Sequence, residues 1–290
     1  MRSVLVTGAN GQLGVALRNI ADSFDGFELY FSDVDTLDIC DKAQIDAFVR
    51  SHCIDTIVNC AAYTAVDKAE DDAELCMRIN RDAVRNIGEV AASVGAKVIQ
   101  ISTDYVFDGC VVSPYREDDA TNPASVYGAS KLAGEQVLLQ VCPDSVIIRT
   151  AWLYSETGSN FLKTMLRLCK ERDILGVVAD QKGTPTYAGD LADAIKTVMM
   201  SERFVSGIYH FTNDGSCTWY DFAVKIFETA NIKCKAKPLT TAEYPTRAKR
   251  PAYSVLDKSK IKETYNISIP AWEDSLINCL CNLNEWKIES

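Results

Sequence analysis

The chain has 290 residues, of which 47% are hydrophobic and 24% charged, and this composition excludes an extended disordered chain. Its 40 acidic residues outnumber its 30 basic ones, and the resulting net charge of −10 argues against binding to a nucleic-acid polymer through bulk charge. No apolar run approaches the ~18 residues that a membrane span requires.

The cysteines and the N-terminal residues indicate the cellular compartment in which we expect the protein. The 11 cysteines form no C-x-x-C pair and no zinc-ligand spacing, so the sequence predicts no metal centre. Unpatterned thiols in this number are typical of a reducing compartment. The first apolar run ends at Gly8 and is too short for a signal peptide. We therefore expect a cytoplasmic protein that does not bind membranes.

Strand-like and helix-like patterns alternate through the first half of the chain. Strands are expected at residues 3–7, 27–32, 56–60, 97–102 and 145–150, and helices at 12–20, 43–51, 73–94 and 125–141. Nearly continuous apolar strands that alternate with helices predict a parallel sheet covered on both faces. Residues 1–150 are therefore expected to form a doubly wound α/β domain.

The second half has a more mixed pattern. Helices are expected at 160–170, 188–201 and 218–230, and strands at 174–179 and 207–212. Residues 233–255 combine basic residues with Pro238, Pro245 and Pro251, which predicts a loop-rich basic segment. No linker separates the halves, so we expect residues 151–290 to form a smaller α/β part interleaved with the first domain.

A glycine-rich loop follows the first expected strand. Gly8 permits a tight turn, Gly11 lets the backbone approach a pyrophosphate, and Gly14 allows close packing of helix on sheet. The following helix offers free N–H groups to phosphate. Three glycines alone also fit a structural turn, but this context predicts a Rossmann-type dinucleotide site. Its expected contacts are Gly8, Asn10, Gly11, Gln12, Leu13 and Gly14.

Acidic residues follow the second expected strand. Asp33 lies 19 residues after Gly14, where a carboxylate binds the adenosine ribose of a dinucleotide. Its charge disfavours a 2′-phosphate, so the sequence leans toward NADH over NADPH. Asp38 and Ile39 lie where a loop could reach the adenine.

Tyr127 and Lys131 occupy one face of an expected helix, four residues apart. A tyrosine pKa near ~10 is too high for ready proton exchange, and a neighbouring ammonium lowers it. Thr103 ends a strand on the side where ligands bind, and its hydroxyl could meet a substrate oxygen. Alternatively, the pair lies on an ordinary solvated helix and Thr103 merely ends a strand.

Together, the glycine loop, Thr103 and Tyr127-x-x-x-Lys131 resemble the extended short-chain dehydrogenase/reductase superfamily. Further motifs are similar to those of its dTDP-4-dehydrorhamnose reductase family over nearly the whole chain. These are VNCAAYTAVDKAE (58–70), STDYVFDG (102–109), NFxxTML (160–166), DQxGxPT (180–186) and Arg250-Pro251. The resemblance implies an NAD(P)-binding Rossmann domain followed by a mostly C-terminal substrate-binding part.

The same resemblance implies reduction of a dTDP-linked 4-keto-6-deoxy sugar, dTDP-4-dehydro-β-L-rhamnose, to dTDP-L-rhamnose by NADPH or NADH. Tyr127 would protonate the developing alkoxide, Lys131 would hold the cofactor ribose and lower the tyrosine pKa, and Thr103 would orient the carbonyl. Ala62, Tyr63 and Thr64 would flank the cofactor, and Asp104, Tyr105, Trp152, Asn160 and Arg250 would contact the substrate. Arg247 and Lys249 join Arg250 as diphosphate contacts or form a solvated basic loop.

Two departures and two alternatives accompany this expectation. Tyr105 replaces the second carboxylate that related dehydratases carry, so elimination chemistry is not expected. Gly189 stands where some relatives carry a metal-binding glutamate at a dimer contact, with Asp190 as a weak substitute. No metal site is therefore predicted, Mg²⁺ is a doubtful cofactor, and monomer and homodimer both stay open. A sugar-nucleotide epimerase and a non-catalytic cofactor-binding regulatory subunit remain the alternative functions.

Overall fold

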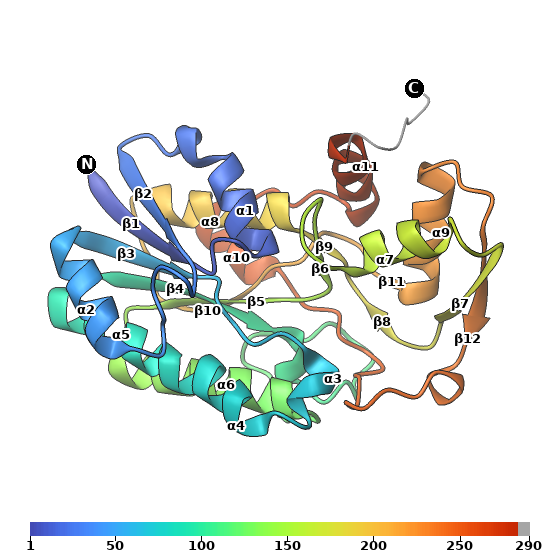
Figure 1. Ribbon diagram of the computed structural model, residues 1–290, viewed down its shortest axis with the longest axis horizontal. Coiled ribbons are helices and arrows are strands. Elements are labelled where there is room, and N and C mark those ends of the chain that lie inside the picture. The colour runs from blue at the N-terminus through green and yellow to red at the C-terminus, as the bar shows by residue number, and fades with distance from the viewer. Residues whose placement is uncertain (284–290) are drawn as a thin grey trace.

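A six-stranded parallel sheet forms the centre of the protein, whose computed structural model describes residues 1–283 (Figure 1). Its strands are β1 (Arg2–Thr7), β2 (Phe27–Ser32), β3 (Ile54–Asn59), β4 (Lys97–Thr103), β5 (Val146–Thr150) and β10 (Gly207–His210). They are ordered β10-β5-β4-β3-β1-β2, and every neighbouring pair is parallel. The expected doubly wound α/β fold is confirmed.

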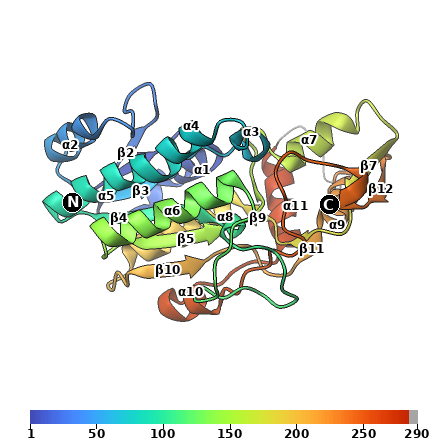
Figure 2. The ribbon, with the colours of Figure 1, turned by 90° about the horizontal axis from the view of Figure 1, so that it is seen from below.

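Helices cover both faces of this sheet (Figures 1 and 2). One layer contains α1 (Gln12–Asn19), α8 (Ala188–Met200) and α10 (Ser259–Tyr265), and the other contains α2 (Lys42–Ser51), α5 (Ala83–Val94) and α6 (Val126–Val141). The strands are buried on both faces for this reason, which explains their nearly continuous apolar runs.

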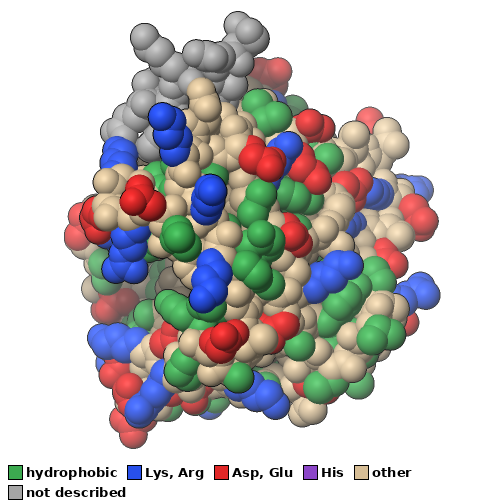
Figure 3. Space-filling view, turned by 90° about the vertical axis from the view of Figure 1, so that its right-hand side faces the viewer, with side chains coloured by type: hydrophobic (Ala, Val, Ile, Leu, Met, Phe, Trp, Pro, Cys, Tyr) green, Lys and Arg blue, Asp and Glu red, His purple; other side chains and the backbone are tan. Residues whose placement is uncertain are grey.

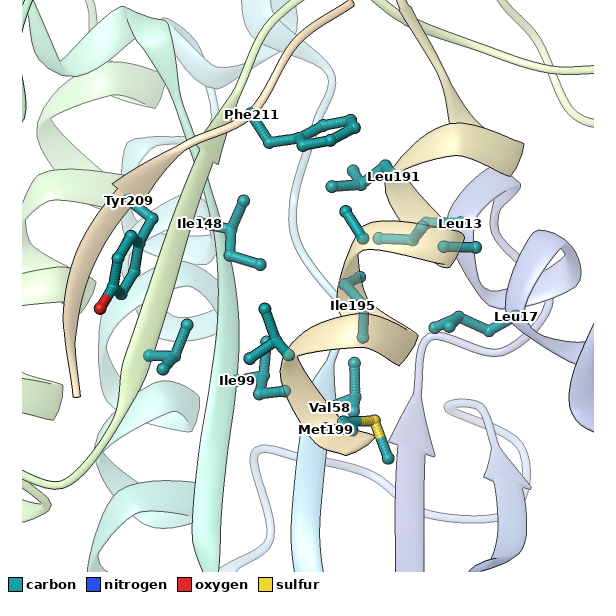
Figure 4. Close-up of a cluster of buried hydrophobic side chains, with 14 of the residues drawn as sticks. Leu13, Leu17, Val58, Ile99, Ile148, Leu191, Ile195, Met199, Tyr209 and Phe211 are labelled. Atoms are coloured by element: carbon teal, nitrogen blue, oxygen red, sulfur yellow. The ribbon is translucent and has the colours of Figure 1, made fainter. Parts of the chain in front are cut away.

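The core between the sheet and the first helix layer is shown in Figure 4. Side chains from α1 and α8 meet side chains from β3, β4 and β5, and all are almost fully buried. Those labelled from these elements are Leu13, Leu17, Leu191, Ile195, Met199, Val58, Ile99 and Ile148. Each contributes about 1.5–3 kcal/mol by leaving water, and together they hold α1 and α8 against the sheet.

One expected helix is interrupted. Residues 73–94 form α4 (Ala73–Met77), a π-helical turn (Arg78–Asp82) and α5. Within the turn, the buried Asn80 amide donates to the Tyr63 carbonyl oxygen and to Ser130 Oγ on α6. A hydrophobic period cannot reveal this turn, because it is fixed by polar contacts to two distant segments.

The second part of the chain has its own apolar cluster. Its main elements are α7 (Phe161–Leu168), β7 (Ile174–Val178), α9 (Trp219–Thr229), β12 (Lys235–Leu239) and α11 (Trp272–Asn282). The shorter ones are α3 (Val66–Ala69) from the first half, β6 (Leu153–Tyr154), β8 (Lys182–Gly183), β9 (Thr186–Tyr187), β11 (Cys217–Thr218), and 3₁₀ turns at Ala21–Ser23, Asp104–Val106 and Thr241–Glu243.

The prediction of a loop for residues 233–255 is wrong in its first third. β12 lies there and pairs in parallel with β7, with Pro238 opposite Val177. A two-stranded sheet has edges on both sides, and an edge strand tolerates a residue without an N–H group. Proline was therefore a misleading signal at this position.

The two halves of the chain are interleaved in space. β10, α8 and α10 all lie beyond residue 150, yet they complete the central sheet and one of its helix layers. The face formed by the second part carries acidic and basic side chains interspersed with apolar ones, so the net negative charge is not gathered there (Figure 3). None of the helices within residues 1–283 has the length and apolarity needed to cross a bilayer.

Candidate active site

A cavity of about 1430 Å³ opens at the carboxyl ends of β1, β3 and β4 and continues under the second part of the chain. It extends from Asp33 and Asp38 at one end to Arg172 and Val177 at the other. The strand order reverses between β1 and β3, which is where open α/β sheets bind ligands. The volume exceeds that of an ordinary single-ligand pocket of roughly 300–1,000 Å³, so two ligands can lie end to end.

Nearly all the residues expected from the sequence line this one cavity. Toward the glycine loop these are Gly8, Asn10, Gly11, Gln12, Leu13, Gly14, Asp33, Asp38, Ile39, Ala62 and Thr64. Toward the second part they are Thr103, Asp104, Tyr105, Tyr127, Lys131, Trp152, Asn160 and Arg250. Segments far apart in the sequence are thus brought to a single site.

The glycine loop is shaped by two close approaches. A Cβ on Gly8, whose φ is +63°, would lie 2.6 Å from Ala61 N, and one on Gly14 would lie 2.5 Å from the Ala9 Cα. At Gly11 such an atom would meet only Gly8 O, at 3.2 Å. Gly11 caps α1 without a side chain, so the first N–H groups of α1 remain available to a diphosphate.

Backbone contacts hold the acidic residues at the adenosine end. Asp33 accepts hydrogen bonds from the backbone N–H groups of Asn10 and Val34, both at 2.8 Å. Asp38 accepts one from Cys40 N at 2.9 Å. Arg78, which no sequence motif indicated, lines the same end beside Cys40 and comes from the π-helical turn.

Tyr63 is held differently from the other expected cofactor contacts, and its contact with the cofactor stays a prediction. Its hydroxyl donates to Asp72 Oδ2 at 2.9 Å, and its backbone N–H donates to Asn80 Oδ1 at 2.9 Å. The residue does not line the cavity, unlike its neighbours Ala62 and Thr64. An alternative partner for the phenol, which the motif could not reveal, turns the ring away.

Tyr127 lies in the first turn of α6, behind the N-cap Ser125, whose Oγ accepts from Gly128 N at 3.1 Å. Its ring packs edge-on against Tyr105, with ring centroids 5.6 Å apart, and its phenol lies beside the Thr103 hydroxyl. Burial raises the pKa of Tyr127 above its usual value. The phenol is therefore a neutral O–H group that can donate a proton.

Lys131 is 4% exposed, and its Nζ donates to Ile101 O at 2.7 Å. Burial lowers the pKa of Lys131 to about 8, against the opposing effect of Glu135. Burial of the phenol raises the Tyr127 pKa by more than a neighbouring ammonium lowers it, and the Lys131 ammonium donates to the Ile101 carbonyl.

A buried ion pair lies one helical turn beyond Lys131. Glu135 receives two hydrogen bonds from Arg149, at 2.9 and 2.7 Å, and both side chains are 2% exposed. Ser102 Oγ also donates to Glu135. These contacts join α6 to β4 and β5 immediately behind the cavity wall.

Thr103 is held by its own neighbours. Its Oγ1 accepts from Tyr105 N at 3.2 Å and lies 3.0 Å from Asp104 Oδ1. Asp104 is 2% exposed, and burial raises its pKa to about 6. Its second oxygen, Oδ2, has no hydrogen-bond partner among residues 1–283.

The three basic residues expected to contact the substrate diphosphate lie in different surroundings. Arg250 lines the cavity, with Nη2 2.8 Å from Asp67 Oδ2 and Nη1 3.4 Å from the Tyr105 hydroxyl. Arg247 forms an ion pair with Asp71 outside the cavity lining, and Lys249 is exposed. Only Arg250 of the three is placed to meet a substrate.

An aromatic pair forms the wall opposite the sheet. Trp152 has a positive φ of +50° and stacks on Trp219, with ring centroids 3.6 Å apart. A Cβ on Gly183 would lie 2.6 Å from the Trp152 ring. Trp219, at the start of the helix expected at residues 218–230, lines the cavity as well. Its helical spacing gave no signal that separates a cavity wall from a core position.

The weak metal candidate is occupied by protein contacts. Asp190 Oδ2 accepts from Asn213 Nδ2 at 2.6 Å and from the Ser275 hydroxyl. Within residues 1–283, no cluster of three or more histidine, cysteine or acidic side chains could hold a metal ion.

Known proteins resemble this chain in sequence and in structure over nearly its whole length. Residues 1–285 match the family model described as RmlD substrate binding domain. A dTDP-4-dehydrorhamnose reductase of Aggregatibacter actinomycetemcomitans is 42% identical, covering 96% of this chain and 98% of its own length. The crystal structure of a Clostridium acetobutylicum dTDP-4-dehydrorhamnose reductase superposes with a TM-score of 0.93 at 42% identity, covering 97% and 99%. That of a Bacillus anthracis reductase in complex with NADP gives 0.94 at 40% identity, covering 97% and 100%.

Proposed function

The chain belongs to the RmlD substrate-binding-domain family together with dTDP-4-dehydrorhamnose reductases, and from this premise we propose that it reduces dTDP-4-dehydro-β-L-rhamnose to dTDP-L-rhamnose. The observation that carries the proposal is the convergence of Thr103, Tyr127 and Lys131 on the cavity that also contains the glycine loop. Hydride transfer requires that the cofactor bound at the glycine loop and the substrate beside Thr103 and Tyr127 lie in contact.

The residues divide the work of the reaction. A bound nicotinamide cofactor supplies a hydride to C4 of the keto sugar. Tyr127, neutral because its pKa is raised, donates its proton to the oxygen on C4. Lys131 presents a buried cation beside the cavity, where it holds the cofactor ribose and favours the phenolate that Tyr127 becomes.

The glycine loop and the start of α1 bind the cofactor diphosphate, since the N–H groups there face an open surface at Gly11. The adenosine end contains both a carboxylate, Asp33, and a cation, Arg78. The Bacillus anthracis reductase binds NADP. We propose that this chain accepts both cofactors, with Asp33 favouring NADH by charge and Arg78 offsetting that preference.

The substrate occupies the part of the cavity between the sheet and the second half of the chain. Arg250 meets its diphosphate, and Trp152 with Tyr105 borders the sugar. Asn160 is fixed by a 2.8 Å bond to Gln12 Oε1 and a 2.9 Å bond to Ser155 O, so it borders both ligands. Asp104 lies at the reacting end of the sugar, next to Thr103.

The setting of the enzyme is part of the proposal. We place it in the cytoplasm, in keeping with the free cysteines of the described chain, and acting as a monomer or homodimer. No role is proposed for Mg²⁺, because Asp190 is already engaged by Asn213 and Ser275.

The test uses the purified protein with dTDP-4-dehydro-β-L-rhamnose, first with NADH and then with NADPH, each with EDTA and with Mg²⁺. Stoichiometric oxidation of the cofactor with formation of dTDP-L-rhamnose is expected, and EDTA should not reduce the rate. Epimerisation without net cofactor oxidation, with NAD⁺ retained on the protein, would replace the proposal by a sugar-nucleotide epimerase. Neither oxidation nor retained cofactor would indicate a regulatory subunit.

A further inference from the structure

The direction of one hydroxyl proton governs what Thr103 can do. A threonine hydroxyl donates a single hydrogen bond and accepts up to two. Thr103 Oγ1 already accepts from Tyr105 N at 3.2 Å and contacts Asp104 Oδ1 at 3.0 Å. An ionised carboxylate can only accept, so an ionised Asp104 takes the one proton that Thr103 has to give.

A neutral Asp104 reverses this bond. The carboxylic acid then donates from Oδ1 to Thr103 Oγ1, which accepts from Asp104 and from Tyr105 N together. The Thr103 proton is freed toward the cavity, where Thr103 and Tyr127 lie side by side. In this arrangement Thr103 can donate a hydrogen bond to a substrate oxygen while it keeps its bond to Asp104.

The surroundings of Asp104 shift its protonation toward the neutral acid. The side chain is 2% exposed, and no ion pair within residues 1–283 involves it. Its Oδ2 forms no hydrogen bond within the described residues, although the Ser254 hydroxyl lies near enough to affect the Asp104 pKa. A buried charge with an unpaired oxygen is costly, and protonation removes that cost. The pKa of Asp104, raised to about 6 by burial, agrees with this geometry.

We propose that Asp104, in its protonated form, is a positioning residue that turns the Thr103 hydroxyl toward the substrate carbonyl. This inference rests on the proposed function. Asp104 acts through Thr103 and transfers no proton in the reaction itself. The hydride goes from the cofactor to C4, the Tyr127 proton goes to the oxygen on C4, and the Tyr127 phenolate regains a proton from solvent.

The groups that face Asp104 come from several elements. Tyr127 faces it from α6 and Tyr105 from the 3₁₀ turn Asp104–Val106, and both are neutral at physiological pH because their pKa values are raised. The Ser254 hydroxyl and the backbone N–H groups of Asp104 and Tyr105 favour ionisation, but less than burial opposes it.

Two charged groups lie farther out, beyond Tyr105. Arg250 contacts the Tyr105 hydroxyl and is itself paired with Asp67. This ion pair lies beyond the Tyr105 ring, and neither member is among the largest contributors to the Asp104 pKa shift. Bound substrate and cofactor carry phosphates, whose negative charge raises the Asp104 pKa further and retains the proton.

Two nearly isosteric variants separate the protonated from the ionised form. Asp104→Asn keeps a neutral group whose amide N–H can donate to Thr103, whereas Asp104→Leu removes the donor. For kcat at about pH 6 we expect Asp104→Asn to lose less than about tenfold and Asp104→Leu to lose roughly 10²–10³-fold, the usual effect of one misplaced oxyanion donor. Both variants should bind NADPH as the wild type does, which cofactor fluorescence can check.

The dependence of kcat on pH distinguishes a positioning role from a purely structural one, because a structural role would not change it. Wild-type kcat should fall as pH rises through the Asp104 pKa of the complex, and Asp104→Asn should lack this fall while keeping the limb of Lys131 nearer pH 8. The proposal would be overturned if kcat of Asp104→Asn fell with rising pH as it does in the wild type. It would also be overturned if Asp104→Asn were as inactive as Asp104→Leu while still binding NADPH normally. The Asp104→Asn profile decides the matter even where Asp104→Leu does not fold.

Melting temperatures give a test that needs no substrate. An acid whose pKa is raised in the folded state costs stability as pH rises from its unfolded pKa to its folded one. The melting temperature of Asp104→Asn relative to wild type should therefore increase between about pH 4 and pH 7, and a constant difference would contradict a neutral Asp104. A wild type that oxidises no cofactor with the sugar would instead overturn the proposed function and, with it, the catalytic role of Asp104, whatever the melting data show.

Discussion

Charged side chains are buried at the inner wall of the cavity and exposed at its outer rim. Lys131 in the inner wall is 4% exposed, and directly behind the wall Glu135 and Arg149 are each 2% exposed and hydrogen-bonded to one another. At the rim, the side chains of Arg250 and Asp67 are 27% and 42% exposed, and those of Arg247 and Asp71 are 63% and 58% exposed. Similar ion pairs therefore experience very different dielectric surroundings.

This difference separates fixed groups from adaptable ones. Buried dipoles and charges at the inner wall act at nearly full strength and need no rearrangement when the reaction proceeds. Pairs at the rim are screened by water and salt, so they can exchange partners when a charged ligand arrives. Substitutions at the inner wall should therefore cost turnover or folding, and those at the rim should cost affinity and ligand choice.

The largest effect is expected for Tyr127→Phe at the inner wall. Loss of the phenolic proton should lower kcat by roughly 10²–10⁴-fold, the usual contribution of a general acid, while NADPH binding persists. Tyr220→Phe is the matched control, because Tyr220 lies on α9 outside the cavity lining. Steady-state kinetics of both variants measure the difference, and a Tyr127→Phe enzyme with near-normal kcat would remove Tyr127 from the acid role.

Glu135→Gln should be the most damaging change to folding at the inner wall. It leaves the buried Arg149 without its counter-charge, which typically costs about 3–5 kcal/mol of unfolding free energy. Glu89→Gln breaks the exposed pair with Lys42 and should cost less than about 1 kcal/mol. Urea unfolding at neutral pH compares the two, and similar losses would mean that burial of the Glu135–Arg149 pair is energetically unimportant.

The sequence predicted which residues line the cavity better than it predicted the partners of their side chains, for a physical reason. Gly8, Tyr127 and Lys131 have fixed spacings because a tight turn and one helical face impose them, and local spacing can be read from a chain. The orientation of Tyr63 depends on Asp72 and Asn80, whose approach is set by tertiary packing. The pairing of Arg247 with Asp71 likewise joins residues more than a hundred positions apart.

The same reasoning applies to the fold. The sheet and most helices followed from hydrophobic period, since each strand is covered on both faces. The π-helical turn at Arg78–Asp82 and the strand β12 did not, because one depends on polar contacts of Asn80 and the other on an edge that tolerates Pro238. The hydrophobic period of a sequence indicates which side chains are buried, but it does not indicate which polar groups will bond to one another.

At the rim, Arg250→Met should weaken substrate binding. The guanidinium lines the cavity, and a charge-assisted hydrogen bond to a diphosphate is worth about 1.5–3 kcal/mol, so KM for the sugar nucleotide should rise roughly 10–100-fold with a smaller change in kcat. Arg247→Met is the matched control, because its side chain is outside the cavity lining, and should change KM by less than about threefold. Equal effects at the two positions would place the diphosphate elsewhere.

The smallest effect is expected at the adenosine end of the rim, where a substitution that changes only charge should alter the choice between NADPH and NADH. Asp33→Asn keeps the size of the side chain and an oxygen that can accept from Asn10 N, but it removes the repulsion of a 2′-phosphate. Because Asp33 is half-buried, this repulsion should be worth roughly 1–2 kcal/mol, so the ratio of kcat/KM for NADPH to that for NADH should rise about tenfold. Arg78→Met should shift the same ratio in the opposite direction, since it removes the cation at this end of the cavity. If both variants move the ratio the same way, the preference is set by the shape of the Asp33 loop instead of by its charge, and the contrast between wall and rim would not extend to the cofactor.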